Sequence, residues 1–419
     1  MKDKDSSKVI LNNSSKEKCG KNKEFNDEFI TTMTKIYHYL RWLGIAGGEE
    51  IIWKMWGGIL ILMYLVIEIE AVWKVIKALA GWAITLAGTR SITARLAGTM
   101  FYTGSMIGLL LCWRLASSWR DLAKYWSAIE GELNVKYLSS DFSMSKSMHI
   151  VTGTFLVCSI FEHILSIIAS SESDCTLEQC LRTYILHSHG FLLLEHEYRD
   201  WMVLPLLFMS NLATLIWNVQ DLIIVLMSMG LSSRYNRLNQ CVAIVSGMVY
   251  MDEYWCKNIE NIKVLTWRRI REEFVNQAKL VRRVDAELGP LILASNFFNL
   301  YFICLQLFLG FTRGLSESFL QEAYYFISFF WLCFRTGCSV LAAANVNRSS
   351  TLALSHLYQC TPQFYNVEIQ RLQKQLTQDY VALSGVGFYS LSRTLVLQMA
   401  ASVFTYVLVL IQYDDSGRK

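Results

Sequence analysis

Residues 202–229 read MVLPLLFMSNLATLIWNVQDLIIVLMSM, and Asp221 is the single charged side chain among them. A helix rises about 1.5 Å per residue, so about 20 mostly apolar residues cross the hydrocarbon core of a bilayer. This segment exceeds that length without a second charge. It therefore predicts a membrane-spanning helix.

Similar segments recur along the chain. Hydrophobic residues make up 53% of the 419 positions and charged residues 18%, whereas an ordinary soluble domain is about a quarter charged. The candidate spans are 57–79, 96–113, 150–169, 202–229, 288–311, 323–344 and 395–413. The first is the weakest, because it carries Glu68 and Glu70. The sequence predicts an all-α polytopic membrane protein with seven transmembrane helices.

The distribution of Lys and Arg predicts the orientation. Segments 1–56, 114–148, 230–287 and 347–393 hold about 29 of the 39 Lys and Arg residues, and the opposite set of segments holds about seven. Basic residues close to spans are retained preferentially in the cytosol. We therefore expect a cytosolic amino terminus and an extracellular carboxyl terminus, which is the reverse of a G-protein-coupled receptor.

We find no independent soluble domain in the sequence. Apolar positions recur at helical spacing across 266–283, so we expect the fifth span to continue as a cytosolic helix. A further amphipathic helix is predicted across 368–380. The expected organisation is a cytosolic tail with a leading helix over 1–56, a seven-helix transmembrane domain over 57–413, cytosolic helical extensions at 230–287 and 347–393, and a short extracellular tail at 414–419.

The last span carries the most specific pattern, TYVLVLIQY at 405–413. Thr405, Val409 and Gln412 lie near one face of that helix. If several copies of the helix met around an axis, Val409 would form an apolar constriction and Gln412 a polar collar outside it. Hydrophobic constrictions gate by dewetting. A lipid-facing helix with polar residues at its outer end accounts for the pattern equally well.

This pattern resembles the signature that closes insect gustatory receptors, with Tyr413 where the signature usually has Phe. The resemblance covers most of the chain from about Leu96 onward. Segments similar to the sugar-sensing branch of that family are FEHILS at 161–166, WN at 217–218 with Asp221 after it, GLSSR at 230–234, NLYFICLQ at 299–306, DYVALSG at 379–385 and FYSLSR at 388–393.

The resemblance implies a sugar-gated, non-selective cation channel, a multi-pass protein of the plasma membrane. In that family four subunits surround a pore lined by the last helix, and cytosolic helical parts form an anchor between subunits. Val409 then corresponds to the gate, Gln412 to the neighbouring pore position, and Thr405 lies on the same face. The implied partners are a sugar, permeant cations, membrane lipid and related subunits in a homo- or hetero-tetramer, with no nucleic acid.

Polar groups at membrane depth predict where a ligand binds, because such groups are costly there and usually functional. A sugar needs carboxylates and amides beside aromatic rings. The candidates are Tyr102, Glu162, His163, Trp217, Asp221, Asn299, Tyr301, Gln306, Trp331 and Arg335. An interhelical ion pair of Arg335 with Glu162 or Asp221, which holds the bundle together, is the alternative interpretation.

One outer segment has a spacing that metal sites use, with His187, His189 and His196 near Glu195 and Glu197. A solvated loop is the favoured interpretation, and no metal site is predicted.

Cys175 and Cys180 lie in the same outer region, where an oxidising environment permits a disulfide.

We find no Walker, Rossmann or nucleophile-elbow motif. Neither a cofactor nor an enzymatic activity is therefore expected.

Two other functions remain as alternatives to a sugar receptor. An odorant or bitter-compound receptor of the same channel superfamily would need a mostly apolar pocket, and the amides and carboxylates argue against it. A solute transporter would show inverted repeats or broken helices. The sequence shows neither feature.

Overall fold

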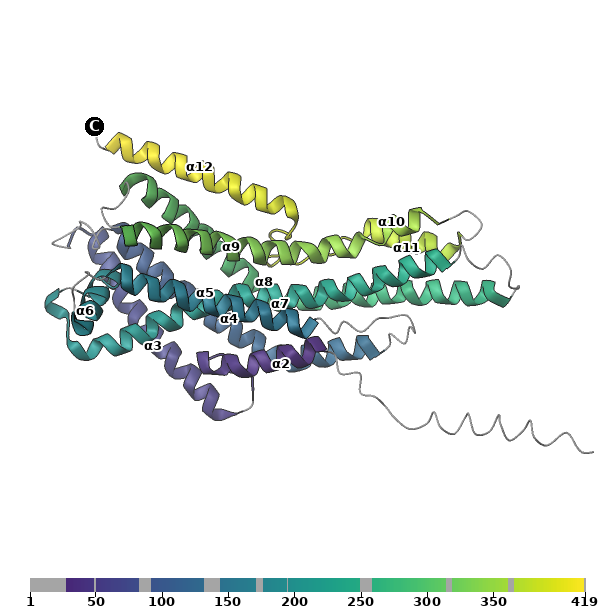
Figure 1. Ribbon diagram of the computed structural model, residues 1–419, viewed down its shortest axis with the longest axis horizontal. Coiled ribbons are helices and arrows are strands. Elements are labelled where there is room, and N and C mark those ends of the chain that lie inside the picture. Colours follow the sequence, from purple (N-terminus) through teal and green to yellow (C-terminus); the bar gives the residue numbers. More distant parts are fainter. Residues whose placement is uncertain are drawn as a thin grey trace, which may run out of the picture.

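The chain folds into an elongated bundle of helices (Figure 1). The computed structural model describes residues 28–48, 50–82, 92–131, 144–170, 176–193, 195–248, 258–313, 319–360 and 365–417. Within these residues the regular structure is helical, apart from an isolated antiparallel bridge between Ser384 and Ser390. The prediction of an all-α fold is confirmed.

The longest helices run along the length of the bundle, and α6 lies at the end opposite α10 and α11 (Figure 1). The α-helices are α2 (Glu28–Leu40), α3 (Ile51–Leu79), α4 (Ile92–Gly131), α5 (Met144–Ala169), α6 (Leu177–Ser188), α7 (Val203–Met248), α8 (Asn258–Arg313), α9 (Phe319–Thr351), α10 (Leu354–Tyr358), α11 (Val367–Gln378) and α12 (Arg393–Gly417). Short 3-10 turns are η1 (Arg41–Leu43), η3 (Glu195–Glu197) and η4 (Asp200–Met202).

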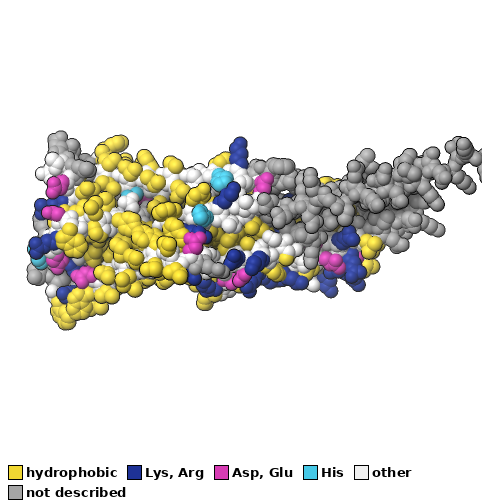
Figure 2. Space-filling view, turned by 90° about the horizontal axis from the view of Figure 1, so that it is seen from below, with side chains coloured by type: hydrophobic (Ala, Val, Ile, Leu, Met, Phe, Trp, Pro, Cys, Tyr) yellow, Lys and Arg dark blue, Asp and Glu magenta, His cyan; other side chains and the backbone are white. Residues whose placement is uncertain are grey.

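Five helical segments of the described chain are long and apolar enough to cross a membrane. They are Arg95–Ile129, Met144–Ala169, Asp200–Ser246, Val264–Phe311 and Phe319–Tyr358. The apolar part of α12, Arg393–Val409, is shorter, and α3 carries several charged residues. Figure 2 shows a broad zone of hydrophobic side chains bounded on both sides by charged ones. The number of seven crossings and their orientation stay predictions.

Helix α7 forms the centre of the bundle. It contacts α4, α5, α8 and α9, and 83% of its most apolar window is buried inside the chain. A helix that is apolar all round needs protein or lipid over every face, and here protein covers most of it. Its single charged residue in this stretch, Asp221, is fully buried. The segment that most clearly predicts a span is therefore shielded by protein from the lipid.

Helices α7 and α8 extend toward the end that carries α10 and α11 (Figure 1). With 46 and 56 residues they are much longer than the roughly 20 residues that cross a bilayer. Helix α8 is continuous for 56 residues, and Arg271 in it donates a 2.8 Å hydrogen bond to Glu368 of α11. This contact with the Arg271 guanidinium lowers the pKa of the Glu368 carboxyl. The helical segments predicted at 266–283 and 368–380 thus pack against each other.

Helix α12 packs on the bundle through a narrow strip. Val403 and Val407 are buried against Ile303 of α8 and Leu332 of α9. Before α12, the chain is held to α8 by Asp285, which accepts hydrogen bonds from the amide and hydroxyl of Ser384 at 2.6 and 2.7 Å. The last helix is therefore fixed at its start and along one face.

Candidate ligand-binding site

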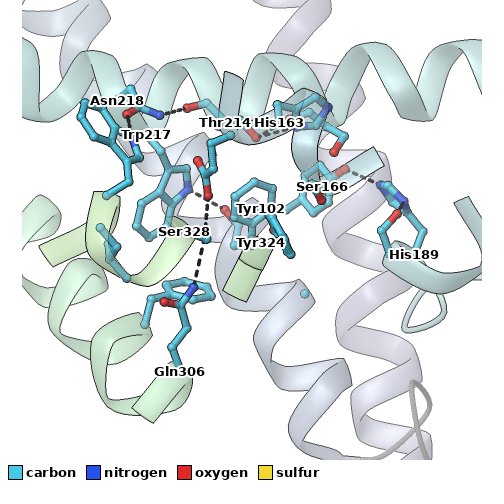
Figure 3. A pocket seen from close by; sticks show the side chains of 18 of the residues that line it. Tyr102, His163, Ser166, His189, Thr214, Trp217, Asn218, Gln306, Tyr324 and Ser328 are labelled. Carbon is cyan, nitrogen blue, oxygen red and sulfur yellow. Dashed lines mark hydrogen bonds between the residues drawn. The ribbon is translucent and has the colours of Figure 1, made fainter. Parts of the chain in front are cut away.

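A cavity of about 280 Å³ lies between α4, α5, α6, α7, α8 and α9. Its volume is near the lower end of small-molecule pockets, which span about 300 to 1,000 Å³. The lining residues are Gly98, Phe101, Tyr102, Glu162, His163, Ser166, Tyr184, Ser188, His189, Phe191, Ser210, Thr214, Trp217, Asn218, Phe302, Gln306, Tyr324, Ser328, Trp331, Leu332 and Arg335. Figure 3 shows polar and aromatic side chains from several helices converging there.

The segment that follows α6 closes one end of the cavity. His189 is buried, and its Nε2 shares a 2.8 Å hydrogen bond with the hydroxyl of Tyr102 on α4. Burial lowers the pKa of the His189 imidazole to about 4, so the ring is neutral at physiological pH. Phe191 packs on Gly98, where an added Cβ would lie 2.4 Å from the Phe191 ring. A glycine is needed at 98 for this close approach.

An aromatic wall is built around Trp217 of α7. Its ring stacks on Phe101 with centroids 5.9 Å apart and meets Phe302 edge-on at 5.1 Å. The indole Nε1 donates a 3.1 Å hydrogen bond to the carbonyl of Phe101. Gly104 of α4 provides room for this indole, because an added Cβ would come within 2.8 Å of it. The wall presents rigid ring surfaces to the cavity.

Polar groups line other parts of the cavity (Figure 3). Glu162 accepts a 2.6 Å hydrogen bond from the Ser328 hydroxyl, and Thr214 shares a 3.4 Å hydrogen bond with Nδ1 of His163. Among the described residues, Nε2 of His163 and Oε1 of Gln306 are buried with no hydrogen-bond partner. Leaving such groups unpaired costs about 1 to 3 kcal/mol each. Both belong to side chains that line the cavity.

An ion pair underlies the cavity. Arg335 of α9 lies 3.1 Å from Asp221 and donates hydrogen bonds to the Trp217 carbonyl at 2.9 Å and to Asn299 at 3.0 Å. Asn299 and Ser295 in turn donate to the Asp221 carboxylate. Of the two interhelical ion pairs that the sequence suggested for Arg335, the structure contains the one with Asp221.

The structure brings most of the predicted ligand-binding residues to this cavity. Seven of the ten predicted residues line it, namely Tyr102, Glu162, His163, Trp217, Gln306, Trp331 and Arg335. Asp221 and Asn299 lie behind it as partners of Arg335. Tyr301 does not line it and instead packs against Phe302. Their roles in binding stay predictions.

Sequence reasoning missed part of the lining. The interpretation of His189 as a solvated loop residue is wrong, because the chain folds back and buries the imidazole on Tyr102. Ser166, Thr214 and Asn218 face the cavity at helical spacing from predicted residues. The spacing of Thr214 and Asn218 around Trp217 is the signal that could have identified them.

Thr405, Val409 and Gln412, the predicted pore residues, are exposed on α12, opposite Val403 and Val407. Their roles stay predictions.

Cys175 lies outside the described residues, so its predicted bond to Cys180 stays a prediction as well. In the described part of the chain, three or more metal-ligating side chains do not come together.

The fold matches a solved membrane receptor. The structure of the insect olfactory receptor OR5 from Machilis hrabei in complex with eugenol aligns with a TM-score of 0.64 at 11% sequence identity, over 92% of this chain and 100% of that one. A second structure of this receptor aligns with a TM-score of 0.63 at 12% sequence identity. At this identity the match shows the fold alone, which is that of an insect olfactory receptor.

A family model described as trehalose receptor matches residues 53–419, and the chain belongs to this family. Similar Drosophila melanogaster proteins are gustatory receptor for sugar taste 64f, 29% identical over 76% of this chain and 66% of that protein, and gustatory receptor 5a for trehalose, 28% identical over 76% and 69%. The chain thus spans about two thirds of the length of these relatives. The predicted sugar gustatory receptor family is confirmed, and it is not a family of enzymes.

Proposed function

We propose that this protein is a sugar receptor that acts as a cation channel and that the cavity beneath α6 binds the sugar. The observation that carries the proposal is the pair of unpartnered buried groups, His163 Nε2 and Gln306 Oε1, in the cavity that the Trp217 ring also lines. A sugar hydroxyl donates and accepts hydrogen bonds, and the C–H face of a sugar packs on an aromatic ring. The polar lining residues can exchange hydrogen bonds with the hydroxyls, and the aromatic residues can pack against the C–H face.

Glu162 gives the site its strongest acceptor. Its carboxyl group accepts one hydrogen bond from Ser328 and retains further acceptor lone pairs. Arg335 is engaged by Asp221 and by backbone beneath the cavity. The cavity therefore favours a neutral polyol with many hydroxyls over a carboxylate ligand, because no unpaired cation faces it among the described lining residues.

The proposed topology has seven crossings, a cytosolic amino terminus and an extracellular carboxyl terminus in the plasma membrane. Helix α3 is proposed as one of the crossings. Two of its charged residues, Glu68 and Lys74, are buried against the bundle and so do not face lipid. Its opposite face is an exposed apolar stripe at helical spacing: Met55, Ile59, Leu62, Val66, Ile69 and Trp73. An epitope placed after Lys419 should be labelled on intact cells. Labelling only after permeabilisation would mean that the carboxyl terminus is cytosolic and that the proposed orientation is wrong.

The proposed assembly is a tetramer with α12 around a central pore. Its support is the exposed face of α12, which a single chain leaves uncovered. The paired helical extensions at 230–287 and 347–393 are the proposed anchor between subunits, in which α8 and α11 already contact each other through Arg271 and Glu368.

Whole-cell current under a panel of mono- and disaccharides tests the function directly. Glu162→Gln and Gln306→Ala should raise the half-maximal sugar concentration by roughly two- to tenfold, since each removes a hydrogen bond worth about 0.5 to 1.5 kcal/mol. Asn211→Ala is the matched control, because this amide bonds the backbone of its own helix and does not line the cavity. Unchanged dose responses for both pocket variants at normal surface levels would place the site elsewhere.

A further inference from the structure

One lining element of the cavity differs from the others in being short and non-helical. Residues 189–193, the pocket cover, follow α6 and contribute His189 and Phe191 to the lining. The cover reaches α4 through the hydrogen bond of His189 with Tyr102 and through the contact of Phe191 with Gly98. The other lining residues belong to helices α4, α5, α6, α7, α8 and α9.

A buried lysine binds the cover from outside the cavity. The ammonium of Lys74 on α3 donates a 2.5 Å hydrogen bond to the carbonyl of Leu192. It also forms a 2.5 Å ion pair with Glu197, and Glu70 lies 3.5 Å away one turn earlier on α3. Only 9% of the Lys74 side chain is exposed. Helix α3 contributes no described residue to the cavity lining.

We infer that Lys74 is a positioning residue that holds the pocket cover over the bound ligand and thereby sets the affinity of the receptor and the lifetime of its response. The inference rests on the proposed function of the cavity. Lys74 links the cover to α3, and it joins the backbone at Leu192 to the carboxylate of Glu197.

The charge of Lys74 explains why such a link is firm. A buried ammonium must keep its hydrogen-bond acceptors, because an unpaired charge away from water is strongly unfavourable. Moving the cover outward would separate Lys74 from the Leu192 carbonyl and leave the ammonium with the carboxylates of Glu70 and Glu197 alone. The closed cover is therefore the arrangement in which this cation is satisfied. A neutral side chain at 74 removes that preference.

The test compares Lys74→Met with Lys77→Met in cells, at matched surface levels. Apparent affinity falls in proportion to the fraction of receptors whose cover is closed. If that fraction drops to about a tenth, Lys74→Met raises the half-maximal sugar concentration about tenfold, and current decays faster after sugar is washed out. Lys77 lies over the Trp73 ring on the same helix. Lys77→Met should leave both quantities unchanged.

A double-mutant comparison tests whether Lys74 and Glu197 act through the same contact. Glu197→Gln should produce a smaller shift than Lys74→Met, because the Leu192 carbonyl and Glu70 still hold the ammonium. Adding Glu197→Gln to Lys74→Met should cause no further change, since the two residues act through one contact. Lys74→Arg should have a higher affinity and a slower decay than Lys74→Met, because it keeps the positive charge.

Two outcomes overturn the inference while leaving the sugar-receptor proposal intact. One is a wild-type dose response and decay rate in Lys74→Met when the wild-type channel itself answers sugar. The other is a fully additive effect of the Lys74 and Glu197 substitutions. If wild type answers no sugar, the proposed function fails instead.

Discussion

Helices α7 and α12 are both apolar, yet their surroundings differ sharply. The apolar part of α7 is covered on every side, and its polar residues find partners within the chain, as Asp221 does with Arg335. Helix α12 is covered along one strip, and Val409 on its other side is 53% exposed. The cavity around α7, the proposed ligand site, is thus lined within one chain, whereas the surface of α12 requires lipid or further subunits to cover it.

This contrast separates two parts of the proposed function. Binding depends on residues that one chain already brings together, such as Glu162, Trp217 and Gln306. Opening a path for ions depends on the uncovered side of α12, which carries Thr405, Val409 and Gln412. Substitutions in the two helices should therefore have different consequences: loss of folding or affinity in α7, and altered current in α12.

The largest effect is expected from Val409→Asn. If Val409 forms the constriction, a polar amide hydrates that ring and removes the dewetted barrier, so current flows without sugar. Whole-cell recording before sugar is added measures it. Leu408→Asn is the matched control, because Leu408 is also exposed, at 45%, but lies about 100° around the helix.

Two results would contradict this assignment. Low resting current in Val409→Asn, with normal surface level and a normal sugar response, means that Val409 is not the gate. Resting current from Leu408→Asn alone means that another face of α12 lines the pore.

The next largest effect is expected from breaking the ion pair beneath the cavity. Arg335→Met leaves Asp221 buried without its cation, which typically costs about 3 to 5 kcal/mol. The variant should fail to reach the cell surface or melt at a lower temperature in detergent. Removing both charges with Arg335→Met and Asp221→Leu should recover part of the loss, because no unpaired charge remains. A melting temperature unchanged by Arg335→Met would show that the pair does not stabilise the bundle.

The smallest effect comes from one substitution made in both helices. Val219 in α7 and Val407 in α12 are both buried, at 1% and 4% exposure. Val219→Ala should lower stability by roughly 1 to 3 kcal/mol, because its closely packed surroundings cannot collapse around the lost methyl groups. Val407→Ala should lower it less and change the sugar response instead, since Val407 belongs to the narrow strip that holds α12. Equal losses of melting temperature would remove the distinction between the two helices.

Much of the fold was predictable because the signals are local. Continuous apolar runs identify the long helices, and helical spacing across 266–283 and 368–380 identified the two segments that pack through Arg271 and Glu368. Most of the polar and aromatic residues proposed from the sequence as ligand-binding line one cavity. Their grouping follows from the high cost of polar groups in a bilayer, which restricts them to sites with partners.

The sequence by itself determined an all-helical membrane protein of a sugar receptor family, because apolar run length and the closing motif are written in consecutive residues. Only the tertiary structure decided that Asp221 pairs with Arg335 beneath the cavity, that His189 is buried on Tyr102, and that Lys74 reaches the cover. These contacts join residues about 90 to 120 positions apart in sequence. Helical periodicity fixes the face on which a residue lies, but the packing of whole helices selects its partner.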